Sequence, residues 1–331
     1  MQVSELFKQS NTILLDGGMG TMLQAAGLKL GARPEELNIT DPALIEGIHG
    51  QYAAAGSRIV NANTFGASAH KLAGSAYTLE QVITAGIENC KRACAPYGAL
   101  TALDVGPLGE LLEPSGTLAF EDAVAEYARI VKAGEAAGAD LIFFETYTDL
   151  YELKAALLAA KENTHLPILA SMSFEAGGRT FTGCTVESFA ATARGLGADA
   201  VGINCSLGPK EIFPMAKRLA EAVPGNFPVF VKPNAGLPRA DGSGYDITPQ
   251  LFALQMKPYR ELHLFAAGGC CGTTPEFIKL LNGTFAGCTP GRPAHRMSSV
   301  LCTPVDTVTV DGITVVGERI NPTGKKRFQQ A

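Results

Sequence analysis

Short β-rich runs recur along the 331-residue chain, and each is followed by an Ala- and Leu-rich segment with helical periodicity. This alternation is typical of βα units that build a parallel sheet. The helical segments include residues 120–137, 150–161 and 211–222, and several end in Gly just before the next run, as a helix C-cap favours. The eight expected strands are residues 13–17, 58–64, 100–105, 141–146, 167–174, 200–206, 228–234 and 262–269.

Eight βα units favour an α/β fold of the (β/α)8 TIM-barrel type. The rival is an open doubly wound sheet, which typically carries a Gly-rich phosphate loop after one strand. The nearest candidate, residues 16–21, has neither the G-x-G-x-x-G spacing nor a P-loop Lys. We therefore expect one barrel over residues 1–297 and a short C-terminal linker over residues 298–331, in which Asp311-Gly312 between two β-rich runs predicts a hairpin.

Composition narrows the class of partner. Apolar residues make up 46% of the chain and charged residues 18%, which is enough to bury a large core. The net charge of −5 disfavours a phosphate-tracking surface, so we expect no nucleic acid partner. The first residues lack a basic, then apolar, leader, and no apolar run approaches the ~20 residues that span a bilayer. We expect a cytoplasmic protein with no membrane partner.

Polar residues recur where the expected strands end. In a (β/α)8 barrel the carboxyl ends of all strands meet at one rim, where catalytic groups lie. Taken singly, an Asp or Asn in such a place more often caps the helix that follows, so their collective position is the informative observation. These residues are Asp16, Asn61, Asn63, Asp104, Glu145, Ser173, Cys205, Asn234 and Cys270.

Eight cysteines in a chain of this profile are not a disulfide framework, so they are core thiols, metal ligands or reactive groups. Cys90 and Cys94 are spaced i, i+4 on an expected helix and could face one metal, although a free cysteine is more often a small buried hydrophobe. Cys205 ends the sixth expected strand and Cys270-Cys271 ends the eighth, so a single strand separates them along the rim. Core or loop positions are expected for Cys184, Cys288 and Cys302.

Cys205, Cys270 and Cys271 form a candidate metal site. Neighbouring residues of a regular strand point to opposite faces, but the glycines that flank the vicinal pair permit the turn that would bring both sulfurs together. Three thiolates without a fourth Cys or His at ligand spacing suit a Zn²⁺ with an open position. Asn234 is a candidate fourth ligand when no substrate is bound. A closed structural zinc and unrelated core thiols are the alternatives.

The donor set of this site also indicates a type of reaction. A zinc ion with three thiolate ligands is a poor Lewis acid toward water, because the sulfurs already neutralise its charge. A coordinated thiol nevertheless loses its proton outright and becomes a nucleophile at neutral pH. The three cysteines therefore favour alkyl transfer to a substrate sulfur over hydrolysis.

Four motifs occur in order along the chain: Asp16-Gly-Gly-Met-Gly-Thr, Asn63-Thr-Phe, Gly202-Ile-Asn-Cys-Ser and Gly268-Gly-Cys-Cys-Gly-Thr. Together they resemble the homocysteine S-methyltransferase family over residues 1 to about 297. The resemblance implies a (β/α)8 barrel with zinc held by Cys205, Cys270 and Cys271. It also implies that the sulfur of homocysteine is the fourth ligand, and that the zinc-bound thiolate is the nucleophile whose methylation gives methionine.

The same resemblance implies contacts to the rest of the substrate. By position, Asp16 and Glu145 match carboxylates that contact the amino group of homocysteine, as ion pairing would favour. Backbone N–H groups of the turn from Gly17 to Gly20, which includes Gly18 and Met19, could receive the substrate carboxylate.

The tail carries a second resemblance. Val316-Gly-Glu-Arg-Ile-Asn-Pro-Thr-Gly is similar to the opening of the folate-binding barrel in cobalamin-dependent methionine synthases. It implies partner modules, on the same parent chain or separate, that bind folate and cobalamin, with methylcobalamin charged from methyltetrahydrofolate as methyl donor. A tail that only clasps the barrel is the alternative. Two other functions stay open: a standalone enzyme that uses S-methylmethionine or another sulfonium donor, and a zinc-binding scaffold without chemistry.

Overall fold

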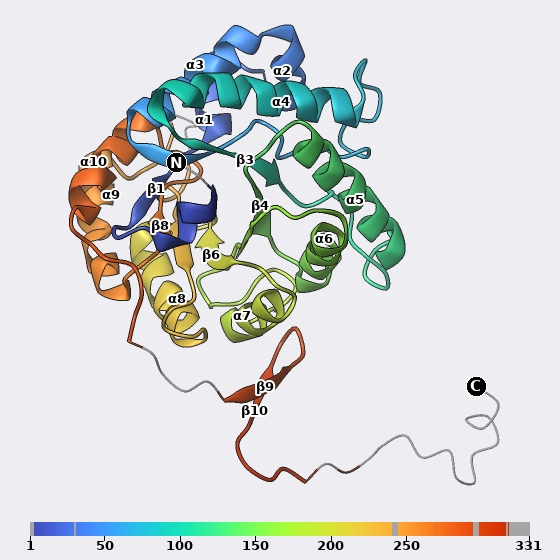
Figure 1. Cartoon of the computed structure of the whole chain (residues 1–331), viewed down its shortest axis with the longest axis vertical. Coiled ribbons are helices and arrows are strands. Elements are labelled where there is room, and N and C mark those ends of the chain that lie inside the picture. Colours follow the sequence, from blue (N-terminus) through green and yellow to red (C-terminus); the bar gives the residue numbers. More distant parts are fainter. Residues whose placement is uncertain (1–2, 30, 240–243, 294–297, 316, 318–331) are drawn as a thin grey trace, which may run out of the picture.

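The computed structural model of the chain describes residues 3–29, 31–239, 244–293, 298–315 and 317. Its centre is a closed barrel of eight parallel strands that pair in sequence order, so the expected (β/α)8 fold is confirmed (Figure 1). The strands are β1 (Ile13–Leu15), β2 (Ser57–Asn61), β3 (Leu100–Val105), β4 (Leu141–Tyr147), β5 (Ile168–Met172), β6 (Ala200–Asn204), β7 (Val229–Lys232) and β8 (Ala266–Ala267).

Helices surround the barrel as an outer ring (Figure 1). The α-helices are α1 (Met19–Ala25), α2 (Leu37–Thr40), α3 (Pro42–Ala54), α4 (Leu79–Cys94), α5 (Phe120–Ala136), α6 (Leu150–Asn163), α7 (Val186–Gly195), α8 (Pro209–Glu221), α9 (Pro249–Gln255) and α10 (Pro275–Phe285). Short 3-10 helices are η1 (Val3–Lys8), η2 (Pro34–Glu36), η3 (Ala95–Tyr97) and η4 (Lys257–Leu262). Within the described residues, no helix combines the length and apolarity needed to cross a membrane.

Side chains fill the barrel lumen in layers. Alternate strand residues face inward, so Phe143 of β4 and Phe230 of β7 meet edge to face, with ring centroids 5.0 Å apart. The other residues of each strand, which alternate with the inward-facing ones, face outward and pack against the helices in the larger core cluster. Leu6 of η1 belongs to the lumen cluster, and Phe7 stacks on Phe265 just before β8. The lumen is therefore a packed core rather than a channel.

A polar layer follows the last apolar layer of the lumen. Ile59, Ala102, Phe143 and Phe230 belong to the lumen cluster. Two residues further along each strand, on the same inward face, the chain places polar side chains, because side chains alternate along a strand. These polar residues are Asn61, Asp104, Glu145 and Lys232, and all four are buried. The strand period thus brings one amide, two carboxyl groups and one ammonium group together at the carboxyl end of the barrel.

Helix capping does not account for the polar residues at the strand ends. Among the described helices, the side chains that accept an N-cap hydrogen bond belong to Asp41, Thr78, Asp149, Thr185 and Thr248. None of these is one of the strand-end residues singled out in the sequence. The capping interpretation of those residues is therefore wrong, and their polarity needs another explanation.

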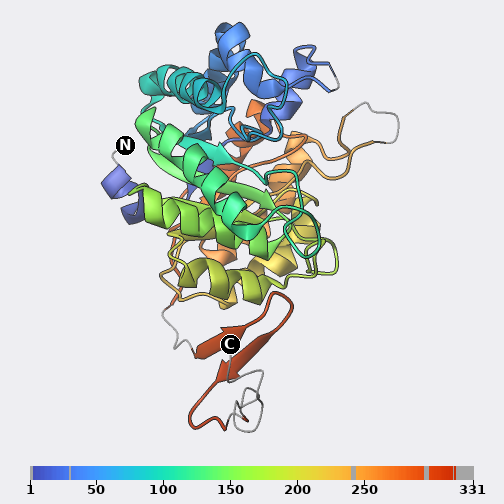
Figure 2. The same cartoon turned by 90° about the vertical axis from the view of Figure 1, so that its right-hand side faces the viewer.

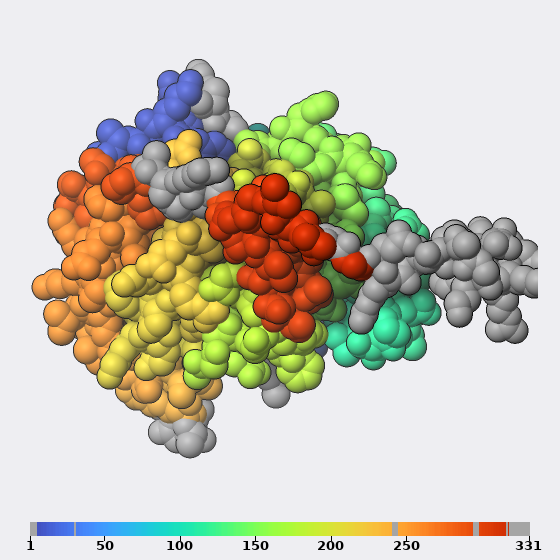
Figure 3. Space-filling view, turned by 90° about the horizontal axis from the view of Figure 1, so that it is seen from below, coloured from blue at the N-terminus to red at the C-terminus, as the bar shows by residue number. Residues whose placement is uncertain are grey.

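The C-terminal segment forms a hairpin, but not where the sequence predicted its turn. Strands β9 (Ser299–Cys302) and β10 (Thr307–Val310) pair antiparallel, so the turn spans residues 303–306 and Asp311-Gly312 follows the hairpin. The hairpin lies outside the barrel against α7 (Figures 2 and 3), where Thr185 N–H donates to Pro304 O. The motif beginning at Val316 and the expected domain boundary near residue 297 lie outside the described residues, apart from Gly317.

Candidate active site

Three thiols converge at the carboxyl end of the barrel. Cys205 directly follows β6, and Cys270 and Cys271 follow β8. Their Sγ atoms all lie within 4.8 Å of one another, and those of Cys205 and Cys271 are 3.8 Å apart. Zn–S bonds of about 2.3 Å in a tetrahedron place sulfurs about 3.8 Å apart, so the spacing fits a shared zinc ion. Among the described residues, no other group of three potential metal ligands reaches this geometry.

The backbone around the thiols is held in an unusual conformation. Cys205 and Ser206 both adopt φ 61°, a left-handed conformation that costs a non-glycine residue on the order of 1 kcal/mol or more. The end of β7 and the residue that follows it stabilise both cysteine segments, because Cys205 N–H donates to Lys232 O and Cys270 N–H donates to Pro233 O. Strain maintained at this point by hydrogen bonds is typical of a site that positions ligands.

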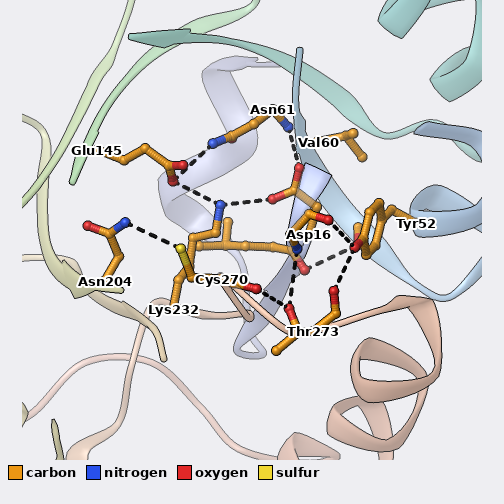
Figure 4. A network of polar contacts seen from close by, with 12 residues as sticks. Asp16, Tyr52, Val60, Asn61, Glu145, Asn204, Lys232, Cys270 and Thr273 are labelled. Carbon is orange, nitrogen blue, oxygen red and sulfur yellow. Dashed lines mark hydrogen bonds and ion pairs between the residues drawn. The ribbon is translucent and has the colours of Figure 1, made fainter. Parts of the chain in front are cut away.

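The three thiols form one hydrogen-bonded acid–base unit. Hydrogen bonds from Cys205 and Cys270 lower the pKa of Cys271 to about 3. Hydrogen bonds with Cys205 and Cys271, together with burial, raise the pKa of Cys270. Asn204 Nδ2 also lies 3.8 Å from Cys270 Sγ (Figure 4). The same Nδ2 donates to Thr146 Oγ1 at 2.7 Å. The pKa of Cys205 is also raised, to about 12, so Cys271 alone of the three is favoured as a thiolate before any metal binds.

A buried lysine links the two carboxylates that the sequence singled out. Lys232 Nζ lies 2.9 Å from Asp16 Oδ1 and 3.0 Å from Glu145 Oε2, and its side chain is 2% exposed (Figure 4). Nζ also lies 5.0 Å from the centroid of the Phe143 ring. Burial lowers the pKa of Lys232, but the charges of Asp16 and Glu145 outweigh it and raise the pKa above its ordinary value. The ammonium group is thus fixed between the two acids.

Asn61 completes this ion-pair network. Its backbone N–H donates to Asp16 Oδ2 at 2.7 Å, and its Nδ2 donates to Glu145 Oε2 at 3.3 Å (Figure 4). Burial raises the pKa of Glu145, and the charge of Lys232 offsets part of that rise. Sequence reasoning missed Lys232. The available signal was its place two residues after an inward-facing aromatic, Phe230, in an otherwise apolar strand.

The glycine turn after β1 packs directly against the vicinal cysteines. A Cβ on Gly17 would lie 2.6 Å from Thr273 Oγ1, and one on Gly18 would lie 2.8 Å from Cys270 O, so both positions require glycine. Tyr52 Oη donates to Thr273 O at 3.0 Å and contacts Gly18 O at 3.2 Å (Figure 4). Gly18 N–H donates to Thr273 O, so this N–H is already engaged.

These groups line one cavity of about 330 Å³. The predicted site residues that line it are Asp16, Gly17, Gly18, Met19, Glu145, Cys205, Cys270 and Cys271. Lys232, Asp104, Glu35, Phe65 and Tyr245 line it as well. Asn234 is not among the lining residues. It is buried, and its Oδ1 has no hydrogen-bond partner among the described residues.

The remaining sequence candidates make structural contacts, although Asn63 also lines the cavity. Cys90 and Cys94 are buried with their Sγ atoms 3.8 Å apart and belong to the core between α4 and the barrel, as expected for packing. Ser173 Oγ donates to Asn204 O at 2.7 Å, and Asn63 Nδ2 donates to Pro34 O at 2.8 Å. Cys184 and Cys288 are buried, in agreement with core positions, whereas Cys302 lies exposed on β9, so the core or loop position expected for it is wrong.

Comparison with protein families gives a match over most of the chain. The family described as homocysteine S-methyltransferase matches residues 13–285. The methionine synthase of Mycobacterium tuberculosis is 32% identical over 344 residues, which cover 96% of this chain and 28% of that protein. The methionine synthase of Mycobacterium leprae is also 32% identical, over 349 residues, with the same coverage. The chain thus spans 28% of the length of these relatives.

Solved structures with the same fold include the homocysteine methyltransferase MmuM from Escherichia coli. Its oxidised form superposes with a TM-score of 0.73 at 23% identity, covering 85% of this chain and 98% of that one. Its metallated form gives a TM-score of 0.70 at 24% identity, covering 85% and 99%. At these identities the likeness extends to the fold, which agrees with the closed eight-stranded barrel.

Proposed function

The chain belongs to the homocysteine S-methyltransferase family, an enzyme family, and on that premise we propose that it methylates the sulfur of homocysteine to give methionine. The observation that carries the proposal is the convergence of three thiols beside two carboxylates in one cavity. The thiols suit a soft metal that binds a substrate sulfur, and the carboxylates suit a substrate ammonium group. An amino acid with a side-chain thiol matches both.

We propose zinc as the metal and Cys205, Cys270 and Cys271 as its ligands. Their sulfur spacing matches tetrahedral coordination, and the cluster already favours a thiolate. Bound zinc would supply a Lewis acid that lowers the pKa of a coordinated substrate thiol. The buried, unpaired Oδ1 of Asn234, two residues beyond β7, supports its role as a fourth ligand when no substrate is bound.

The residues of the chain would hold homocysteine at both ends. Glu145, fixed by Lys232 and Asn61, would accept from the substrate ammonium group, and Asp16 would contribute its charge to the same subsite. Backbone N–H groups between Gly17 and Gly20 would receive the carboxylate, with Gly18 N–H excepted because it already donates to Thr273 O. This arrangement would leave the sulfur as the only reactive atom at the metal.

In the transfer step the electron pair of the substrate sulfur forms the new S–CH3 bond. The bond between the methyl group and its donor breaks, and its electron pair stays with the donor. We propose methylcobalamin as donor, recharged from methyltetrahydrofolate on further modules, because the chain covers 28% of methionine synthases that it matches over 96% of its own length. We also propose that the barrel domain ends at residue 297 and that residues 298–331 are a linker toward such modules.

Donor identity and the metal site are tested together. The full chain, loaded with Zn²⁺, is offered homocysteine with either methylcobalamin or S-methylmethionine, and methionine is quantified. We expect methionine from methylcobalamin, and loss of both zinc and product in Cys205→Ser. The matched control is Cys302→Ser, whose thiol is exposed on β9 away from the cavity and should change neither. Methionine formed only from S-methylmethionine would refute the donor, and full zinc retention in Cys205→Ser would refute the ligand set.

A further inference from the structure

Asp104 is a buried carboxyl group with one oxygen, Oδ1, that has no hydrogen-bond partner among the described residues. It ends the inward-facing series Leu100, Ala102 and Asp104 on β3, lines the cavity, and is only 6% exposed. Its backbone is fixed, because Thr64 Oγ1 donates to Asp104 O and accepts from Asp104 N–H. Its Oδ1 is fully buried and has no hydrogen-bond partner in the described part of the chain, whereas the side chain of Asn61 hydrogen-bonds to the carboxyl group. A buried carboxyl oxygen without a hydrogen-bond partner is costly, so Oδ1 at the wall of the cavity points to a ligand.

The neighbouring carboxylates of Asp16 and Glu145 already accept hydrogen bonds. Both oxygens of Asp16 are occupied, Oδ1 by Lys232 and Oδ2 by the N–H of Asn61. Glu145 Oε2 accepts from Lys232 and from Asn61 Nδ2, whereas Glu145 Oε1 has no partner among the described residues. The acceptors that remain available in this part of the cavity therefore belong to Asp104 and to Glu145 Oε1.

The geometry brings these acceptors together. Asp104 pairs with Phe143 in the register of β3 and β4, and both side chains point into the lumen. Glu145 lies two residues beyond Phe143 on the same face, so the two carboxyl groups occupy neighbouring positions. Burial and the charge of Glu145 raise the pKa of Asp104, and the charge of Lys232 offsets part of that rise.

The balance of acidic and basic groups in the cavity indicates which ligand Asp104 could bind. Asp16, Asp104 and Glu145 supply three acidic groups, and Lys232 supplies one cation that is already shared by Asp16 and Glu145. A ligand with a primary ammonium group brings one positive charge and three N–H donors. We propose that Asp104 is a further substrate-binding residue, which together with Glu145 Oε1 receives the α-ammonium group of the thiol substrate. This inference rests on the proposed function and assigns to Asp104 the contact that the sequence assigned to Asp16.

The test compares two thiols that differ only in the amino group, homocysteine and 4-sulfanylbutanoate. Binding of each to the Zn²⁺-loaded full chain is measured by titration calorimetry for wild type, Asp104→Asn and Glu152→Gln. Glu152 is the matched control, a buried carboxyl on α6 that accepts from Leu108 N–H and Tyr127 Oη outside the cavity. Asp104→Asn should weaken homocysteine binding by about ten- to a hundredfold, the loss expected for a charge-assisted hydrogen bond.

The same substitution should leave 4-sulfanylbutanoate binding unchanged, so the preference for the amino thiol collapses. Glu152→Gln should preserve that preference. A merely structural role for Asp104 would weaken both thiols together, and this result, or an unchanged preference in Asp104→Asn, would overturn the inference. Asp104→Ser gives a second measurement of the same ratio should the Asn variant fold poorly. If wild type binds neither thiol, the proposed function itself fails, which is distinguishable from a failure of the Asp104 assignment alone.

Discussion

Replacing Lys232 by Met tests whether the ion-pair network at the top of the lumen is a unit. The methionine keeps most of the side-chain volume but removes the ammonium group that lies 2.9 Å from Asp16 and 3.0 Å from Glu145. Two buried carboxylates would then lose their shared cation. Breaking a buried ion pair by removing one partner costs about 3–5 kcal/mol, because the remaining charge stays desolvated. We expect Lys232→Met to lower the free energy of unfolding by an amount in this range.

The loss should depend on pH in a defined direction. In wild type the charge of Lys232 offsets part of the rise that burial imposes on the pKa of Glu145. Without Lys232 the folded-state pKa of Glu145 rises further above its unfolded value. A group with a raised folded pKa destabilises the fold as pH increases through that pKa, by up to about 1.4 kcal/mol per pH unit. The deficit of Lys232→Met should therefore be smaller at pH 4 than at pH 7.

Urea denaturation followed by circular dichroism measures both effects. The control is the neutral triple variant Asp16→Asn, Glu145→Gln, Lys232→Met, which removes all three charges and should recover much of the lost stability. Two results would refute the reasoning: a Lys232→Met variant within about 1 kcal/mol of wild type, or a triple variant no more stable than the single one.

Further predictions concern residues away from the thiols. His49 of α3 is fully buried, and burial lowers its pKa to about 3. Between about pH 6.5 and pH 3 the unfolded chain binds this proton and the folded chain does not. The free energy of unfolding should therefore fall by up to about 1.4 kcal/mol for each unit by which the pH is lowered in this range. His49→Leu should make that part of the stability–pH curve shallower by one proton, and an unchanged slope in urea titrations would contradict the assignment. Gly202→Ala would place a Cβ 2.3 Å from the Phe230 ring and should cost about 1–3 kcal/mol in urea denaturation. Gly47→Ala within α3, where a Cβ meets nothing within 4 Å, should be neutral or stabilising by up to about 1 kcal/mol, and a comparable loss in both variants would argue against the clash.

The strand pattern was sufficient to predict the barrel, because a period of two inside an apolar run and a period near 3.6 between runs leave few alternatives. It was less informative where local geometry overrides composition. The eighth strand was expected over residues 262–269 but spans only Ala266–Ala267, since Lys257–Leu262 forms a 3-10 helix and His263 adopts φ 48°. The hairpin turn formed at residues 303–306 rather than at Asp311-Gly312, where the following residues 313–315 do not pair.

The sequence likewise predicted some features of the site and not others. Residue chemistry and chain order were enough to place Cys205, Cys270 and Cys271 at one rim, because parallel strands end on the same side of a barrel. Hydrogen-bond partners were not predictable, since they depend on side-chain directions across strands far apart in sequence. Lys232 and Asp16 are separated by more than two hundred positions, and their ion pair exists only because the barrel closes. The cytoplasmic location expected from the sequence stays a prediction.

We propose that three thiols hold a zinc ion whose fourth position accepts the sulfur of the substrate. Zinc-edge X-ray absorption on the full chain tests it most directly, recorded with and without homocysteine. We predict three sulfur neighbours and one oxygen or nitrogen neighbour without homocysteine, and four sulfur neighbours at about 2.3 Å with it. A coordination shell that homocysteine leaves unchanged, or a chain that binds no zinc, would contradict this zinc site.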